Sequence, residues 1–523
     1  MVDVIICSMI TSQKTQENSD FFNFYSIELV DALITQNDSL TQKINELEKQ
    51  NAWFKEQFKL ASQRHFGQSS ETAHSLNLSL FDEAMSDSQP GEESSLPKSE
   101  KITYTRKKKS VGRRIDLSRF PKHQKIYDLD EQDKTCGCGQ LLEKIDDQDS
   151  SIQVDYVRES IKVIEHVSLK YCCRRCQTLR SAKKPETAIQ KCMATPAFVA
   201  DVVTKKYEQH LPLYRQSKIL EGLGADIPDN TLGNWVMRSA EALEPLRTAS
   251  KEQIPLVHLL QADETKVKTL KPNKEGYLWG YHSCDPGNRF ILFDYSASRG
   301  AHVVDEMLKD FSGLLQTDGY QGYNNQRKRD GVINFGCWDH GHRKFTDIIK
   351  VSDKEKKGKA AEFLKLISRL YDIEREAKIM SPPERKIHRQ TWAKPVLDHI
   401  YQEAIKINAP TKSLLNVAVT YLKNQWPYLI NYLDYGEVPI SNCWIENQIR
   451  PFALGRKNWM FTGTPESAQK AALLYSLIQT CKMNGINARA YLEYVLNQVN
   501  AMRRGDISPT SLLPQFVDKT IFI

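Results

Sequence analysis

The sequence predicts a multidomain protein of the α+β class, and three observations support this prediction. The chain has 523 residues, which is more than a single hydrophobic core usually serves. The pattern of apolar residues is helical between residues 194 and 250. From residue 256 onward, short apolar runs rich in branched and aromatic residues alternate with helical stretches, which is typical of a mixed α/β sheet.

The N-terminal region, residues 25–81, is predicted to contain a coiled coil. Apolar residues recur every seven positions and fill two sets of core positions: Leu33, Leu40, Leu47 and Phe54 in one set, and Val30, Ile44 and Phe58, together with Asn37 and Asn51, in the other. Asparagine at such positions fixes the register of a parallel two-stranded coil. We therefore expect a homo-oligomer, and the alternative is a single amphipathic helix packed on its own domain.

Residues 82–114 are predicted to form a disordered linker that ends in a basic run. The first part is acidic and rich in Ser and Pro, with almost nothing to bury. Lysines and arginines then follow closely, among them Arg113 and Arg114. A run of this kind is either a solvated segment or a contact for DNA phosphates.

The next region, residues 115–190, is predicted to be a zinc-binding ribbon. Cys136 and Cys138 form one tight pair, and Cys173 and Cys176 form a second pair in the sequence YCCRRC. Two thiolate pairs on turns can close a tetrahedral zinc site, and the segment between them has the alternation of strands. Buried free thiols are the alternative.

The region 191–250 is predicted to be helical, with the outline of a helix-turn-helix. A turn is expected at 227–228, and either Asp229 or Asn230 can cap the helix that follows. Trp235 faces inward on that helix. An ordinary helical hairpin has the same outline, so the pattern does not decide between DNA binding and packing.

Residues 251–464 are predicted to form the α/β catalytic domain, with a helical insertion at about 346–436. Five apolar runs are the expected strands: 257–260, 277–281, 290–293, 314–315 and 332–335. Residues 465–523 are predicted to be a C-terminal helical domain, since four residues fall at helical spacing: Leu473, Leu477, Ile478 and Cys481.

Three acidic residues are candidates for catalysis and metal binding. Asp263 and Asp318 each end an apolar run, and acids at strand ends lie where a crevice can form. Glu446 lies on an expected helix. Three converging carboxylates can hold two Mg²⁺ or Mn²⁺ ions, which activate an attacking hydroxyl and stabilise the leaving oxygen of a phosphodiester.

Each of these acids also has a structural explanation. Asp263 can cap a turn, and Asp318 precedes a glycine in a common turn pair. Glu446 and Arg450 have the spacing of a surface ion pair on a helix. Spacing alone therefore leaves the catalytic interpretation open, and Glu264 competes with Asp263 for the first position.

Composition excludes several classes of function. The 11 cysteines are odd in number and partly clustered, which does not fit a secreted disulfide framework. No segment is long and apolar enough for a membrane span, and no Gly-rich phosphate loop indicates an ATP-driven reaction. The net charge of +7 permits a polyanionic partner. We expect a cytoplasmic, nucleoid-associated protein.

Motifs along most of the chain resemble one family. In order they are RHFGQSSE, ATPAFVADVVTKKYEQHLPLYRQ, NTLGNWV, LQADET, GYLWGY, FDYSASRG, QTDGYQGYN, GCWDHGHRKF, NCWIENQIRPFALGRKNWMFTG, AALLYSLIQTCKMNGI and SLLP. This series closely resembles transposases of the insertion-sequence-66 family. The resemblance implies a ribonuclease-H-like domain with an Asp–Asp–Glu triad, here Asp263, Asp318 and Glu446. It also implies an N-terminal zipper-like helix, a zinc-binding segment and a helix-turn-helix.

The resemblance also covers two basic motifs, whose residues are His340, Arg343 and Lys344 in the first, and Arg450, Arg456 and Lys457 in the second. Near a reacting phosphate they would contact DNA, and otherwise they form structural ion pairs. The chain departs from the family at Asn447, where Arg usually follows the Glu, at the pair Ser441-Asn442 and at the contracted first cysteine pair. No departure removes a triad carboxylate, but whether this copy is active stays open.

The sequence thus predicts a DNA transposase that cuts the ends of a mobile element and joins the 3′-hydroxyls to target DNA. Its cofactors would be Mg²⁺ or Mn²⁺ at the triad and structural Zn²⁺, and its partner would be double-stranded DNA, with or without accessory proteins. One alternative is a DNA-binding protein with a decayed nuclease domain. The other is a nuclease that cuts structured DNA without strand transfer.

Zinc should be structural and separable from catalysis. Purified protein is expected to carry about one zinc ion per chain, measured by elemental analysis. Changing Cys173 and Cys176 to Ser should remove the zinc, whereas Cys7→Ser should retain it, because Cys7 lies outside both pairs. Zinc-free protein from a chelator-free preparation would contradict the ribbon.

Overall fold

The computed structural model describes residues 19–66, 161–164, 170–172, 179–181, 186–189, 192–351 and 358–522. The chain divides into two compact units, residues 1–88 with 165–523, and residues 89–164. The expected linker, including Arg113 and Arg114, lies outside the described residues, and so do the four cysteines of the expected zinc site.

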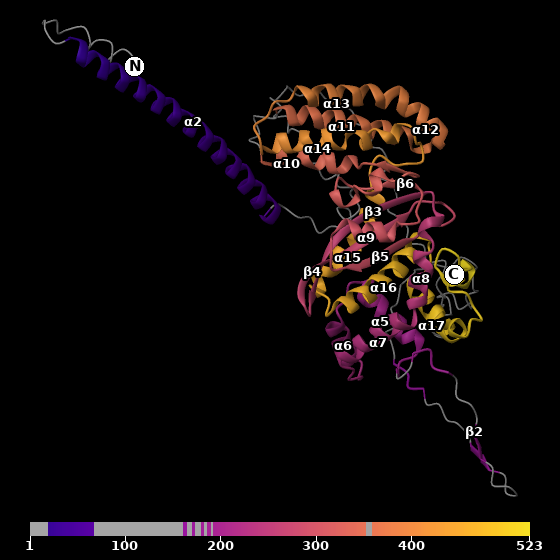
Figure 1. The fold of residues 1–523 in the computed structure, drawn as a ribbon. Coiled ribbons are helices and arrows are strands. Elements are labelled where there is room, and N and C mark those ends of the chain that lie inside the picture. Colours follow the sequence, from indigo (N-terminus) through magenta and orange to yellow (C-terminus); the bar gives the residue numbers. More distant parts are fainter. Residues whose placement is uncertain are drawn as a thin grey trace, which may run out of the picture. The chain divides into compact units, whose positions relative to one another are not determined.

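The described elements of the first unit follow one another along the chain as Figure 1 labels them. The helices are α2 (Ser19–Phe66), α5 (Pro196–Tyr207), α6 (Leu213–Gly222), α7 (Asp229–Ala242), α8 (Glu244–Lys251), α9 (Ala301–Met307), α10 (Trp338–Val351), α11 (Gly358–Glu376), α12 (Pro382–His388), α13 (Lys394–Lys406), α14 (Leu414–Leu429), α15 (Cys443–Trp459), α16 (Pro465–Met483) and α17 (Ala488–Arg504). The strands are β1 (Lys170–Cys172), β2 (Leu179–Ser181), β3 (Leu259–Leu270), β4 (Asn273–Ser283), β5 (Ile291–Ser296), β6 (Gly313–Gln316) and β7 (Val332–Phe335).

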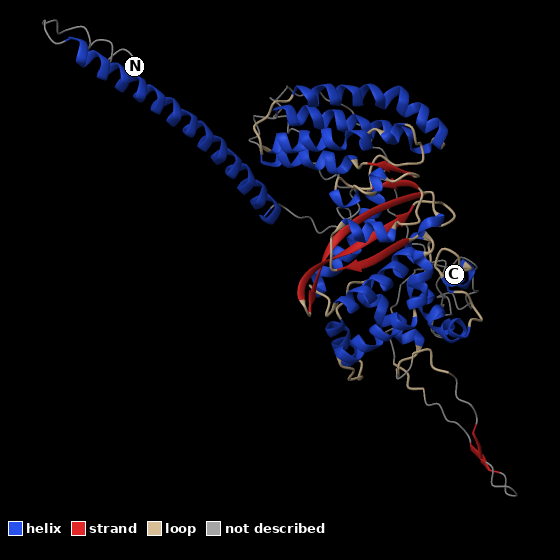
Figure 2. Ribbon diagram, in the orientation of Figure 1, coloured by secondary structure: helices blue, strands red, loops and turns tan. Residues whose placement is uncertain are grey.

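A mixed five-stranded sheet, red in Figure 2, has the strand order β5-β4-β3-β6-β7. Strands β3, β4 and β5 are antiparallel neighbours, whereas β6 and β7 run parallel to β3. Each of the five expected strands is present, and β3 and β4 are longer than their apolar runs because they pair as one hairpin from Leu260 to Ser283. A mixed α/β protein is thereby confirmed.

The two faces of the sheet are covered by different helices. Side chains such as Ala262 and Leu292 pack with Val304 of α9 on one face. On the other face, Val267 and Phe293 belong to the core formed with α15, α16 and the helices of residues 196–251. Helices far apart in the sequence, before and after the sheet, therefore share one hydrophobic core.

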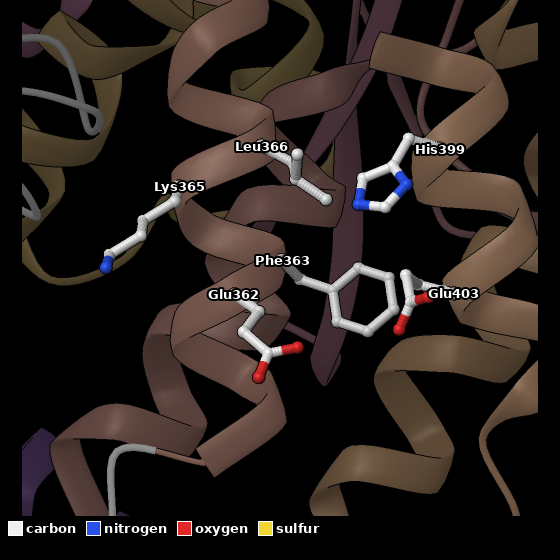
Figure 3. A pocket seen from close by; sticks show the side chains of 6 residues that line it. All are labelled: Glu362, Phe363, Lys365, Leu366, His399 and Glu403. Carbon is white, nitrogen blue, oxygen red and sulfur yellow. The ribbon is translucent and has the colours of Figure 1, made fainter.

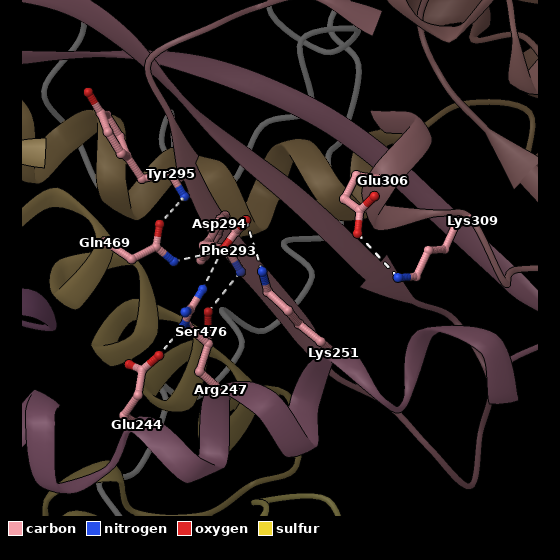
Figure 4. Close-up of polar contacts among 10 residues, drawn as sticks. All are labelled: Glu244, Arg247, Lys251, Phe293, Asp294, Tyr295, Glu306, Lys309, Gln469 and Ser476. Carbon is pink, nitrogen blue, oxygen red and sulfur yellow. Dashed lines mark hydrogen bonds and ion pairs between the residues drawn. The ribbon is translucent and has the colours of Figure 1, made fainter. Parts of the chain in front are cut away.

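Helix α16 takes the place of a neighbouring strand along the edge strand β5. Three outward N–H groups of β5 donate to its side chains: Ile291 to Thr480 Oγ1 at 3.2 Å, Phe293 to Ser476 Oγ at 2.7 Å and Tyr295 to Gln469 Oε1 at 3.0 Å. Figure 4 shows two of these bonds beside Asp294, which also binds Arg247 and Lys251 of α8. The edge is thus closed against pairing with another chain.

The N-terminal helix α2 is one continuous helix of 48 residues. From Leu33 to Phe58, its expected core positions are exposed in the single chain, for example Leu40 at 49% and Leu47 at 62%. An apolar stripe in water favours a partner for this helix, and the coiled coil stays a prediction. Further along, β1 and β2 form an antiparallel pair, and the connection between them contains Cys173 and Cys176.

Helices α6 and α7 have the expected outline of two helices joined by a short turn. Trp235 and Val236 are buried on α7, as the sequence predicts. The expected cap is wrong, because α7 begins at Asp229, its N-cap residue is Pro228 and no side chain caps it. Asp229 instead lies in the first turn, where a carboxylate interacts favourably with the helix dipole.

A group of helices, α10 to α14, stands between β7 and α15, at the place of the expected helical insertion. The helices begin at Trp338, several residues before the expected start at about 346. Arg389 is fully buried here, and it binds both carboxylate oxygens of Glu374 and three backbone carbonyls of the returning chain at Tyr432, Tyr435 and Val438. This arginine fixes the path by which the chain returns to α15.

The bonds between β5 and α16 should contribute measurably to stability. Ser476→Ala leaves the buried N–H of Phe293 without its partner, and Thr480→Val does the same for Ile291, so each change should cost about 1–3 kcal/mol of unfolding free energy. Chemical denaturation measures this. Thr411→Val, in an exposed loop, is the matched control, and equal stability of all three variants would contradict the account.

Candidate active site

Asp263 lies inside strand β3, opposite Gly280 of β4. The expectation that Asp263 ends a strand, or caps a turn, is wrong, because pairing with β4 carries β3 on to Leu270. The strand that ends beside it is β6, whose pairing with β3 stops at Gln261 and Gln316. Asp263 therefore lies where β3 loses its parallel neighbour.

Asp318 follows the end of β6 at a matching position. Gln261 and Gln316 are register partners, and each aspartate comes two residues after its glutamine. Because side chains two residues apart in extended chain share a face, the two aspartates point to the same side of the sheet. Asp318 Oδ1 also accepts a bond from the N–H of Tyr320 at 2.9 Å, so the turn explanation holds as well.

The same two glutamines hold the start of α15. Gln261 Nε2 donates to Gln316 Oε1 at 2.8 Å and to the carbonyl of Ser441 at 3.3 Å, and its Oε1 accepts from the N–H of Ile445 at 3.0 Å. Gln316 Nε2 donates to the carbonyl of Pro439 at 2.8 Å. Both side chains are fully buried. This pair joins β3, β6 and the helix that carries Glu446.

Glu446 lies in the first turn of α15, with a side chain that is 18% exposed. Its carboxylate is 3.7 Å from His340 Nε2 and 3.6 Å from Arg343 Nη2, both on α10. Two of the basic residues that the sequence singled out thus contact the third acid of the expected triad. Glu446 therefore faces α10 and the sheet.

The pKa values of Asp263 and Glu446 are raised, and Asp318 contributes to both shifts. Burial raises the pKa of Asp263 well above its usual value, and the charges of Asp318, Glu264 and Glu446 raise it further. Burial also raises the pKa of Glu446 to about 7, although Arg343 opposes the shift. Three ionised carboxylates in this space repel one another, so a cation would relieve an existing electrostatic cost.

Glu264 lies on the opposite face of the sheet from Asp263, as alternation along β3 requires. Its side chain is 2% exposed and is held by Arg299 at 2.6 Å and by the hydroxyl of Tyr323 at 3.3 Å. Burial and Asp318 raise its pKa, whereas Arg299 lowers it. Because Glu264 is already paired with Arg299, Asp263 is the better candidate for the first acid of the expected triad.

The donor set suits a hard divalent cation. Within the described part of the chain, no three His, Cys, Asp or Glu side chains are grouped closely enough to hold a metal as they stand. Asp263 and Asp318 nevertheless share a face and have carboxylate oxygens, the ligands that Mg²⁺ and Mn²⁺ prefer. Asp263 also lacks a cationic partner among the described residues. Asp263 and Asp318 therefore fit such an ion, whereas the carboxylate of Glu446 contacts His340 and Arg343 of α10.

The other basic residues that the sequence singled out lie in different surroundings. Lys344 lies 4.9 Å from the ring centroid of Tyr421, on α14. Arg450 is half-buried on α15, and Lys457 near its end is exposed. Arg456 donates to the backbone carbonyl of Lys266, which is a structural contact. His340 and Arg343 contact the carboxylate of Glu446.

Sequence reasoning missed residues that position the acids. Gln261 and Gln316 stand in the stretches LQADET and LLQTDGY, each two positions before an aspartate. Because side chains two residues apart in a strand share a face, this repeated spacing could have predicted that each glutamine lies beside its aspartate. Arg327 and Tyr421, which lie beside Asp318, carry no comparable signal, because their contacts depend on how the insertion folds back.

A cavity of about 320 Å³ lies elsewhere, between α11 and α13 of the insertion (Figure 3). Its walls include Phe363, Leu366 and His399, with Glu362 and Glu403 at the rim. Lys359 binds both of these glutamates, at 2.8 and 3.3 Å. None of the residues proposed for catalysis lines this cavity.

Comparison with known proteins agrees with the geometry. Residues 191–470 match the family described as "Transposase IS66 family", residues 476–514 match the "IS66 C-terminal element", and residues 133–177 match the "zinc-finger binding domain of transposase IS66". The sheet, its acidic residues and these matches together place the chain in the class of transposases.

Two relatives come from Sinorhizobium fredii. "Uncharacterized protein y4jD" is 30% identical over 415 residues, which cover 75% of this chain and 80% of the relative. "Uncharacterized protein y4hP" is 29% identical over 391 residues and 70% of each chain. The chain belongs to the IS66 transposase family. Membership implies DNA as a partner, a divalent metal and bound zinc. None of the described helices meets the length and hydropathy needed to cross a bilayer.

The raised pKa of Glu446 predicts a pH-dependent stability. Between the usual pKa of 4.5 and the folded value of about 7, the folded state binds more protons than the unfolded state, so stability falls as pH rises. Without divalent metal, Glu446→Gln should exceed wild type in stability at pH 8 by about 1–3 kcal/mol, and the difference should shrink toward pH 5. Denaturation in chelator at both pH values measures this, and a less stable variant at pH 8 would contradict it.

Proposed function

We propose that this chain is a DNA transposase that cuts phosphodiesters at the ends of its mobile element and joins the 3′-hydroxyls to target DNA. The observation that carries the proposal is that Asp263 and Asp318 each come two residues after one of the register partners Gln261 and Gln316. The same two glutamines hold the start of the helix that carries Glu446. These are the acids that the family resemblance implies for the triad. Membership of the IS66 transposase family supports the same activity.

We further propose that the sheet is the ribonuclease-H-like domain of that resemblance. Its support is the order β5-β4-β3-β6-β7, in which three antiparallel strands are followed by two parallel strands. The first aspartate lies on the central strand, the second follows the adjacent parallel strand, and the glutamate lies on a helix after the sheet. The helices α10 to α14 are then an insertion between the last strand and that helix.

In this proposal the site catalyses two successive displacements at phosphorus, the first at the element's end and the second in target DNA. Two divalent cations bound by Asp263, Asp318 and Glu446 would activate the attacking hydroxyl and stabilise the leaving oxygen. Asp263 and Asp318 present their carboxylates to the same space, and Arg343 places a guanidinium where a phosphate can bind. Water first cleaves a phosphodiester and leaves a 3′-hydroxyl, which then displaces a 3′-oxygen in target DNA.

His340 would remain a neutral imidazole beside Glu446 during these steps. Burial lowers its pKa, although Asp318 opposes the shift. A neutral ring can accept or donate a hydrogen bond without adding charge, so it would orient Glu446 and leave the cation to balance the acids. This role is separate from that of Arg343, whose guanidinium would contact a DNA phosphate.

The remaining regions would hold the DNA. We propose that the zinc-binding segment, α6 with α7 and the basic run bind the element's ends, and that α2 pairs two subunits. Support comes from the zinc-finger match at residues 133–177 and from the exposed apolar stripe of α2. Two subunits would then bring two ends together.

A DNA-binding protein with a decayed nuclease domain is the alternative. The observation in its favour is that Glu446 contacts His340 and Arg343 in place of the aspartates. Metal-dependent cleavage of an end-containing duplex separates the two proposals, since a decayed enzyme would bind that duplex and leave it intact.

Charge at the triad should be essential for chemistry and not for DNA binding. Asp263→Asn keeps the side-chain shape but removes a metal ligand, so cleavage and strand transfer should fall at least about 1000-fold. Asp318→Asn and Glu446→Gln should behave alike. Gel assays of cut and joined products, with parallel measurement of end binding, test this.

Glu264→Gln is the matched control for these variants, because Glu264 lies on the other face with Arg299. It should keep far more activity than Asp263→Asn. An inactive Glu264→Gln beside an active Asp263→Asn would show that the first acid is misassigned. Cut products without any joined products would favour a nuclease over a transposase.

A further inference from the structure

The loop that carries Asp318 is tied to the helical insertion by one arginine. Arg327 Nη2 donates to the backbone carbonyl of Asp318 at 2.9 Å and to Oε1 of Gln425, on α14, at 3.0 Å. Its Nη1 donates to Asn324 Oδ1 at 3.2 Å. A single guanidinium thus joins the backbone of a triad residue to a helix about 100 residues further along the chain.

A second residue of α14 supports the same guanidinium. The carbon Cζ of Arg327 lies 4.4 Å from the ring centroid of Tyr428, which is three residues after Gln425 and so on the same face of the helix. Stacking of this kind adds to the hydrogen bonds and restricts the arginine to one orientation. Gln425 is itself buried, at 7% exposure.

Tyr421, one turn earlier on α14, fits between two glycines near the site. A Cβ atom at Gly319, the residue after Asp318, would lie 2.6 Å from Cε2 of Tyr421. A Cβ at Gly341 of α10 would lie 3.8 Å from Cε1 of the same ring. The buried hydroxyl of Tyr421 has no hydrogen-bond partner in the described part of the chain. Three successive turns of α14 therefore face the Asp318 loop.

We propose that Arg327 is a positioning residue for Asp318, and that the insertion, through Gln425, sets the affinity of the triad for its divalent cation. Arg327 binds the backbone carbonyl and not the carboxylate, so it restrains the loop without occupying a carboxylate oxygen, and Oδ1 accepts only the N–H of Tyr320 in the described part of the chain. Without this restraint, repulsion from Asp263 would turn Asp318 away. The inference rests on the proposed function, because it assumes that the triad binds metal.

The test measures direct binding of Mn²⁺ to the full-length protein without DNA. Binding is detected as loss of the free-ion signal in electron paramagnetic resonance. Gln425→Met keeps the size of the side chain and removes the acceptor, and Arg327→Lys keeps the charge and loses the fork of donors. Each should weaken Mn²⁺ binding about tenfold, as changes to residues that orient metal ligands commonly do. The double variant should be little weaker than either single variant, because both changes break one bridge.

Lys328→Ala is the matched control, since Lys328 is the exposed neighbour of Arg327 and should leave Mn²⁺ affinity unchanged. Thermal unfolding of each variant separates positioning from folding. A variant that unfolds at a lower temperature but binds Mn²⁺ like wild type would overturn the inference and reduce the bridge to a packing contact.

Asp263→Asn distinguishes failure of this inference from failure of the proposed function. If Asp263→Asn abolishes Mn²⁺ binding and Gln425→Met does not weaken it, the triad binds metal without help from the insertion, and only the inference is wrong. If Asp263→Asn binds Mn²⁺ as tightly as wild type, the proposed metal site is wrong, and the inference is wrong with it.

Discussion

The hydrogen bond between the buried amides of Gln261 and Gln316 joins β3 to β6, and Asp263 and Asp318 each come two residues after one of these glutamines. Each amide also binds backbone groups on the approach to α15, so the helix that carries Glu446 is fixed to the same pair. Neither side chain contacts solvent, and a buried amide without partners costs about 1–3 kcal/mol. The strands and the helix are therefore held in one relative position, and this position determines where the three acids lie.

This rigid arrangement brings together carboxylates that repel one another. The neighbouring cations show how the fold tolerates them: Arg343 lies beside Glu446, Arg299 neutralises Glu264 on the opposite face, and Arg327 holds the backbone of Asp318. Asp263 has no such cation among the described residues, and burial together with the neighbouring acids raises its pKa well above its usual value. In the proposed function, a divalent cation would supply the positive charge that offsets this repulsion.

Local pattern was enough to predict the five strands and the inward residues of α7 and α16, because short apolar runs and a period of 3.6 residues reveal them. The choice of Asp263, Asp318 and Glu446 came from the family resemblance and stays a prediction. Local pattern was not enough for contacts that join distant segments. The bond from Phe293 to Ser476 spans 183 residues, and that from Arg327 to Gln425 spans 98. Asp263 was placed at a strand end for the same reason, since only pairing with β4 extends β3 past it.

The most direct test of this account is a crystal structure with an element end and Mn²⁺, in which anomalous scattering locates the ions. The account predicts two Mn²⁺ ions about 3.5–4 Å apart, bound by Asp263, Asp318 and Glu446, with Glu446 moved away from Arg343. Ions bound by other carboxylates such as Glu264, or a Glu446 that still contacts Arg343 while the DNA end is in place, would contradict it.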